Sequence, residues 1–209
     1  MDHLQLNLAK DIVIKIFKIK IKHVKKLIDK PYFKSEALLL SVCYLDYLSH
    51  FFVQGQKGSK RFCHLLIDHG KNSLIWGAFY PQLYDKETSK LKKNKIIIDK
   101  EFISYHDAKK YINDADLFKG TLSYFLYREV RCIAVHHQFC SASGKIRIPV
   151  IFKIEGLLGS INFIGDTLLN QERSLTVEDL FEELNYLINK LELIESNNFI
   201  KFIQNVDDF

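Results

Sequence analysis

The fold is decided by an apolar run, ALLLSVCYLDYLSHFFV, at residues 37–53. The run contains no Gly or Pro, and Ser35 and Glu36 stand directly before it as helix-start residues. It therefore predicts a largely buried helix. One acidic residue, Asp46, lies in its middle. Because a buried charge needs a partner, we expect Asp46 to hydrogen-bond a Tyr, His or Arg side chain, with an orienting role towards a site as the alternative.

Other segments predict helices around this one. Residues 5–29 alternate lysines with apolar residues in a way that fits either a strand or a helix. More than twenty residues without Gly or Pro is long for a strand, so we predict a basic amphipathic helix that Pro31 ends. The remaining predicted helices are Lys60–His69, stopped by Gly70, Asp107–Ile112, Leu117–Val135, and a last long helix whose start is marked by Thr176 and Asp179.

Two regions lack helical spacing. Residues 71–105 give a poor signal and are rich in lysine, so we expect an irregular excursion there. Between residues 145 and 165 the period changes to two, which predicts a strand from Ile146 to Phe152 that Leu157–Phe163 can join as a hairpin. We therefore predict a single domain over residues 1–209, mainly α. It is a bundle of four to five helices with a small β-hairpin insertion before the last long helix.

Composition limits the class of protein. The chain has 209 residues, 47% of them hydrophobic, which is enough for one core. The net charge of +5 is mild, but residues 10–30 hold eight lysines, whereas the stretch from Glu172 onwards is acidic. Such asymmetry suggests a polyanionic partner or a basic-to-acidic contact between subunits, and it equally fits a solvated helix face.

The cysteines and the apolar runs indicate a cytoplasmic protein. None of the four cysteines shows CxxC spacing, so we expect buried thiols in a reducing compartment and no metal site; they are Cys43, Cys63, Cys132 and Cys140. No apolar run reaches the length of a membrane span. We therefore expect no membrane contact.

One pair of residues could carry chemistry. Arg131 and His136 are separated by four residues at the end of the predicted helix 117–135. A His with a pKa near neutrality can move protons, and Arg can bind phosphate through two parallel hydrogen bonds. Five α-helical positions turn through roughly 500°, which leaves the two side chains about 140° apart on one helix. A snorkelling Arg and a capping His without catalytic function would show the same spacing.

The context of this pair resembles a known family. The chain combines the buried helix around Asp46, a basic turn that ends in Lys57-Gly58-Ser59-Lys60-Arg61-Phe62, and the series Leu126, Tyr127, Arg131, Cys132 and His136. Together these are similar to the HEPN superfamily, and more narrowly to a group of bacterial HEPN-like proteins. The resemblance is best over residues 35–70 and 117–137. Two residues depart from that pattern, Cys132 at an often polar position and His137 where an acid is common.

The resemblance implies a helical homodimer that cleaves RNA without a metal or cofactor. The 2′-hydroxyl would attack the adjacent phosphate, with His136 in proton transfer and Arg131 as the phosphate clamp. Two facing copies would bring both residues into one cleft. Possible supporting residues are His137, Arg128 and Asp46, and possible RNA-binding residues are Lys57, Lys60 and Arg61.

Three functions follow from these observations. The first is a HEPN endoribonuclease, as a toxin or phage-defence effector restrained by an antitoxin protein. The second is a catalytically inactive HEPN-like module for dimerisation or for binding nucleotides or RNA, which Cys132 favours. The third is an unrelated helical protein in which Arg131 and His136 are structural. The sequence leaves the choice open.

Overall fold

The computed structural model describes residues 3–81, 84, 103–132, 160–162 and 174–194. Within these ranges the chain is mainly helical, which confirms the predicted class. The described helices also include 3-10 and π-helical turns, and the strands are only two or three residues long. No helix in the described ranges combines the length and the apolar character needed to cross a membrane.

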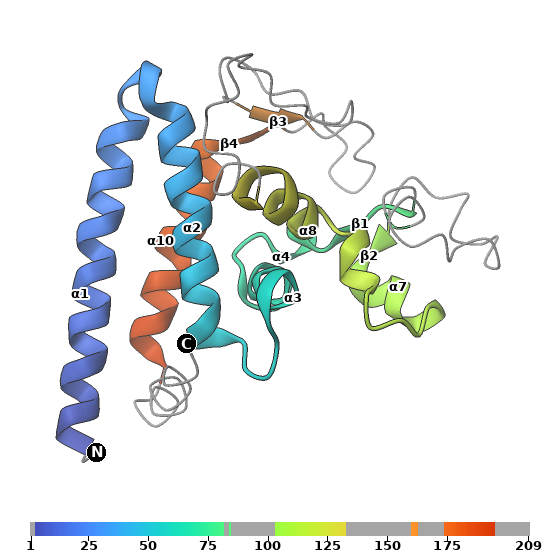
Figure 1. Ribbon diagram of the computed structural model, residues 1–209, viewed down its shortest axis with the longest axis horizontal. Coiled ribbons are helices and arrows are strands. Elements are labelled where there is room, and N and C mark those ends of the chain that lie inside the picture. Colours follow the sequence, from blue (N-terminus) through green and yellow to red (C-terminus); the bar gives the residue numbers. More distant parts are fainter. Residues whose placement is uncertain (1–2, 82–83, 85–102, 133–159, 163–173, 195–209) are drawn as a thin grey trace.

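Three long helices form one side of the molecule (Figure 1). They are α1 (His3–Ile28), α2 (Lys34–Phe52) and α10 (Val177–Leu193), and each contacts the other two. The short 3-10 turn η1 (Pro31–Phe33) reverses the chain, so that α1 and α2 run antiparallel. The helices predicted at residues 5–29 and 37–53 and the last long helix are thereby confirmed.

The core lies between these helices because each has one apolar face. In α2, Val42, Leu45 and Leu48 are fully buried, and Leu184 and Leu187 of α10 are buried opposite them. Each such side chain contributes about 1.5–3 kcal/mol when it is removed from water. The largely buried character predicted for α2 follows from this packing.

The lysines of α1 are divided between the chain's own acidic helix and solvent. Lys18 forms an ion pair with Glu192 of α10, and Lys10 donates to the backbone carbonyl of Glu192 at 2.8 Å. Other lysines of α1 are exposed, namely Lys15, Lys20, Lys22 and Lys26. Part of the predicted basic-to-acidic contact is therefore made within one chain.

After α2 the chain turns and enters a second group of short elements. Gly55 and Gly58 have φ angles of +70° and +51°, values that side chains with a Cβ rarely adopt. Helix α3 (Gly58–His64) and the π-helical turn η2 (Leu65–His69) follow, and Gly70 leaves the helical conformation. The predicted helix Lys60–His69 is confirmed, with its last turn wider than an α-helix.

The beginning of the predicted irregular excursion is ordered and buried. Helix α4 (Ser73–Trp76) leads into strand β1 (Ala78–Phe79), which pairs antiparallel with β2 (Ile103–Ser104). Trp76 is fully buried and Phe79 is as well. The predicted irregular excursion therefore begins with regular elements that are buried over residues 76–81, whereas Lys71 and Leu74 are exposed, and residues 85–102 lie outside the described residues.

The predicted helix 117–135 is built from three different turns. A 3-10 turn, η4 (Leu117–Gly120), comes first, and α8 (Leu122–Leu126) begins after Thr121, whose hydroxyl accepts from the backbone N–H of Tyr124. The π-helical turn η5 (Tyr127–Cys132) then extends it. Residues 133–135 lie outside the described residues. Helix α7 (Tyr105–Tyr111) confirms the helix predicted at 107–112.

A small antiparallel pair of strands stands before α10, as predicted in kind. Strand β3 (Ser160–Asn162) pairs with β4 (Ser174–Thr176), in the register Ser160 with Thr176. The strand Ser174–Thr176 was not predicted, and the predicted pairing of residues 157–163 with residues 146–152 is not tested. Residues 146–152 lie outside the described residues.

Candidate functional site

Arg131 and Asp46 form the centre of the candidate site. Both Nε and Nη2 of Arg131 lie 3.1 Å from Oδ2 of Asp46, so that η5 is fastened to the middle of α2. The two side chains are mostly buried, with 27% of Arg131 and 13% of Asp46 exposed. Asp46 thus bonds an arginine, one of the three partners expected for it. A charged hydrogen bond of this kind fixes the guanidinium in one orientation.

Aromatic rings hold Arg131 from another side. Its guanidinium carbon lies 5.3 Å from the ring centroid of Tyr127, within the range of a cation–π contact. The ring of Tyr127 in turn packs on Phe62 of α3, with 5.3 Å between centroids. All of this occurs in a π-helical turn, a rare conformation that is frequent at functional sites.

The second oxygen of Asp46 is an exception among buried polar atoms. Oδ1 is buried and has no hydrogen-bond partner in the described part of the chain. A buried oxygen without a donor costs free energy, so such an atom calls for an explanation such as a functional role. Asp46 is therefore both the anchor of Arg131 and a strained point of the fold.

A second arginine, Arg61 of α3, lies close to the same carboxylate. Its Nε donates to Oγ of Ser49 at 3.0 Å, and its Nη2 is hydrogen-bonded to Nε2 of His50. The hydroxyl of Ser49 donates to the backbone carbonyl of Asp46, which leaves its oxygen able to accept from Arg61. One turn of α2 therefore holds Arg61 as well as Arg131.

The contact with Arg61 fixes the protonation of His50. Arginine only donates, so Nε2 of His50 must accept and the ring proton lies on Nδ1. Burial lowers the pKa of His50 and the positive charge of Arg61 lowers it further, while Asp46 acts in the opposite direction. His50 is consequently neutral at pH 7.

The electrostatics of the site are dominated by positive charge. Burial lowers the pKa of Arg61, Asp46 and Tyr127 raise it, and Arg131 lowers it again. Burial also raises the pKa of the Cys43 thiol beside Arg131 and Asp46, so this thiol stays protonated. The guanidinium groups of Arg61 and Arg131 thus lie around the carboxylate of Asp46 in a partly buried place.

Sequence reasoning found some of these residues and missed others. Asp46, Arg61 and Arg131 were candidates, and the structure brings them together. His50 and Ser49 were missed, although the four-residue spacing from Asp46 to His50 places both side chains on one face of a helix. That spacing was the available signal.

The remaining candidates are elsewhere. The guanidinium of Arg128 lies over the ring of Tyr124, with 5.9 Å between its central carbon and the ring centroid. Lys57 is exposed just before α3, and Lys60 is partly exposed on it. His136, His137 and the side chain of Cys132 lie outside the described residues.

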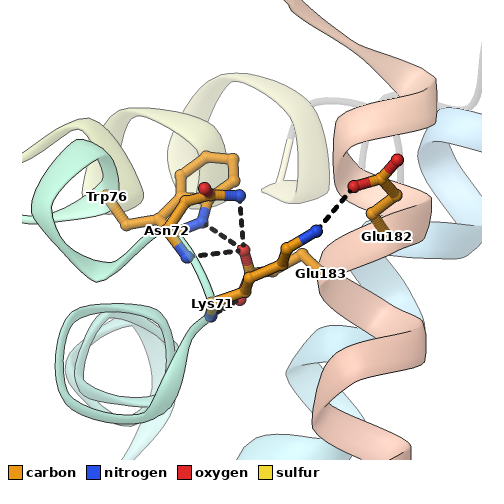
Figure 2. A network of polar contacts seen from close by, with 5 residues as sticks. All are labelled: Lys71, Asn72, Trp76, Glu182 and Glu183. Atoms are coloured by element: carbon orange, nitrogen blue, oxygen red, sulfur yellow. Dashed lines mark hydrogen bonds and ion pairs between the residues drawn. The ribbon is translucent and has the colours of Figure 1, made fainter. Parts of the chain in front are cut away.

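A second polar centre, shown in Figure 2, has a structural purpose. The carboxylate of Glu183 on α10 is fully buried. It accepts from the backbone N–H groups of Lys71 and Asn72, from Nδ2 of Asn72 at 3.3 Å and from Nε1 of Trp76 at 2.9 Å. Since both oxygens are satisfied, Glu183 fastens the segment after α3 to the three-helix layer. Sequence analysis did not identify it.

Comparisons with family models, curated proteins and solved structures gave no match to this chain. The resemblance to the HEPN superfamily therefore stays a prediction. In the described ranges, no three His, Cys, Asp or Glu side chains converge as a metal site would require.

Proposed function

We propose that this chain is a metal-independent endoribonuclease of the HEPN type, with Arg131 as the phosphate clamp and His136 as the proton-transfer residue. The observation that carries the proposal is the fixed orientation of the Arg131 guanidinium, which Asp46 and the ring of Tyr127 hold in a π-helical turn. A guanidinium that is already oriented loses little side-chain freedom when it binds substrate.

The chemistry would proceed within the RNA strand. The 2′-oxygen attacks the adjacent phosphorus as its proton is removed, and the bond from phosphorus to the 5′-oxygen breaks. The 5′-oxygen leaves with a proton, and a cyclic phosphate remains on the other fragment. His136 transfers the protons and Arg131 stabilises the negative charge on the phosphate oxygens. No redox step or metal is needed for this balance.

The proposal includes a homodimer and, as a toxin or defence effector, an antitoxin partner. Arg131 lies in a π-helical turn, and residues 133–136 lie outside the described residues. A dimer remains the simplest way to bring two Arg131–His136 pairs, one from each copy, into one cleft. Sedimentation velocity of the full chain tests it directly, since a monomer at all concentrations would contradict it.

A second candidate function is an RNA- or nucleotide-binding module without catalysis. Asp46 favours it, because a carboxylate bonded to Arg131 compensates the charge that would otherwise attract a phosphate. The nuclease and the binding module would differ only in whether the bound RNA is cleaved.

The deciding assay measures cleavage of single-stranded RNA in EDTA. We expect the wild-type chain to cut the RNA, and Arg131→Ala and His136→Ala to lose at least about a hundredfold of the rate. The control is Lys109→Ala, an exposed residue of α7 that should retain full activity. Equal cleavage by all four proteins would contradict the proposal. Binding without cleavage by the wild type would select the second candidate.

A further inference from the structure

We propose that Arg61 binds a backbone phosphate of the RNA and that His50 is the residue that positions it. This inference rests on the proposed function, because it adds a second phosphate contact to the site of Arg131. In this inference Arg61 is a substrate-binding residue that α2 holds in one orientation, and not a flexible charge on the surface.

The two arginines of the site differ in what holds them. Arg131 is bonded to a carboxylate, so much of its charge is compensated locally. Arg61 is bonded to a hydroxyl and to a neutral imidazole, which orient the guanidinium without compensating its charge. Arg61 is therefore the stronger attractor for an anion.

The hydrogen bonds of Arg61 leave one edge of its guanidinium available. Nε and one N–H of Nη2 are used by Ser49 and His50. The two N–H groups of Nη1 and the other one of Nη2 have no partner among the described residues. The residue Arg61 as a whole is partly exposed. The edge formed by Nη1 and Nη2 matches two phosphate oxygens.

The charge of the site fits a phosphodiester. Arg61 and Arg131 both lie near the carboxylate of Asp46, and among the described residues only Arg131 is in ion-pair contact with it. The guanidinium of Arg61 can therefore bind the negative charge that each phosphodiester carries. Burial already lowers the pKa of Arg61, as expected for a cation that is partly removed from water. Lys57 is exposed at the start of the same segment and extends the positive surface along a strand of RNA.

His50 determines where the available edge of Arg61 points. It can do so only while Nε2 accepts a hydrogen bond, which requires the neutral ring. His50→Gln keeps an acceptor oxygen on a side chain of similar length, whereas His50→Leu removes it. Neither substitution changes the charge of the neutral site, so a difference between the two reports positioning alone.

The test measures binding of a fluorescein-labelled, single-stranded 2′-O-methyl RNA to the full chain by fluorescence anisotropy in EDTA. This RNA cannot be cleaved, because its 2′-oxygen carries a methyl group. We expect Arg61→Gln to weaken binding about tenfold and to reduce the slope of log K against log salt concentration by about 0.7. The charge-matched control is Lys109→Gln on α7, which should change the affinity less than about twofold.

The positioning role of His50 is tested in the same assay. We expect His50→Leu to weaken binding at least about threefold and His50→Gln to restore most of it. Thermal unfolding of each variant checks that the protein is folded at the temperature of the binding assay. The inference fails if Arg61→Gln binds as the wild type does, if Lys109→Gln loses as much, or if the two His50 variants bind equally.

Failure of this inference and failure of the proposed function give different results. If the wild type does not cleave unmodified RNA but Arg61→Gln weakens binding, Arg61 is a phosphate-binding residue in a protein without catalysis. If the wild type cleaves and Arg61→Gln keeps full affinity, only the role of Arg61 is overturned.

Discussion

Arg131 donates from Nε to Oδ2 of Asp46 and places Nη2 in ion-pair contact with the same oxygen, although the two residues are 85 positions apart in the chain. The contact joins the π-helical turn η5 to the buried helix α2. The contact therefore contributes to the stability of the fold and also orients a guanidinium. Experiments can separate these two effects.

Asp46→Asn is expected to lower the free energy of unfolding by about 2 kcal/mol, because it weakens a charged hydrogen bond in a mostly buried place. Urea unfolding of Asp46→Asn, Arg131→Gln and the double variant measures the coupling. The comparison is Asp11→Asn on the exposed side of α1, which should change stability by less than about 0.5 kcal/mol. Strictly additive effects of Asp46→Asn and Arg131→Gln would show that the contact adds nothing to the free energy of unfolding.

Glu183→Gln is expected to lower the free energy of unfolding by about 2–4 kcal/mol. The buried carboxylate accepts hydrogen bonds on both oxygens, whereas an amide places an NH₂ group against at least one of those donors. The matched control is Glu182→Gln, one residue earlier. Glu182 is exposed and pairs with Lys71 at 2.8 Å, so its loss should cost less than about 1 kcal/mol. Similar losses for both variants would contradict the anchoring role of Glu183.

Stability is expected to fall as the pH drops below about 6.5. Burial lowers the pKa of His50 and of His69 from the ordinary value of 6.5, and positive charges nearby act in the same direction. The unfolded chain therefore binds more protons than the folded chain in this window, so that acid favours unfolding. The contribution is complete above pH 6.5 and is lost towards the lowered pKa values.

Urea unfolding between pH 5 and 8 measures this dependence. The variants His50→Gln and His69→Gln should each flatten the curve, and His23→Gln, exposed on α1, serves for comparison. Unchanged curves for the first two variants would show that other groups cause the acid sensitivity.

Gly70→Ala is expected to destabilise the fold by about 1–3 kcal/mol for steric reasons alone. The φ angle of Gly70 is −65°, which alanine adopts readily. A Cβ there would lie 2.5 Å from the carbonyl oxygen of Leu66 and 2.7 Å from Oε1 of Glu183. Gly55→Ala is the contrasting variant, because its Cβ meets nothing within 4 Å while its φ angle is +70°. Chemical denaturation compares them, and a loss at Gly70 no larger than about 0.5 kcal/mol would contradict the clash.

The helices could be predicted from the sequence because their signal is local. The apolar faces of α1, α2 and α10 repeat every three to four residues, and no Gly or Pro interrupts them. The small β element before α10 could be predicted in kind, but its strand β4 could not, since a strand of three residues carries almost no periodicity.

The site could be predicted only in part. The apolar surroundings of Asp46 indicated that it needed a partner, but the choice of Arg131 depends on a contact between distant segments. Trp76 was placed in an irregular excursion because its acceptor, Glu183, is also far away in the sequence. His50 escaped notice because it is neither a metal ligand by spacing nor near the Arg131–His136 pair.

The layer made by α1, α2 and α10 has a consequence for synthesis of the chain. The first two helices leave the ribosome early, whereas the third, which buries Leu45 and its neighbours with Leu184 and Leu187, is made long afterwards. Until then α2 can pack on α1 and on elements made in between, among them α3, η2 and η5, but the surface that α10 covers stays exposed. The layer of long helices is therefore completed late, through contacts between segments far apart in the sequence.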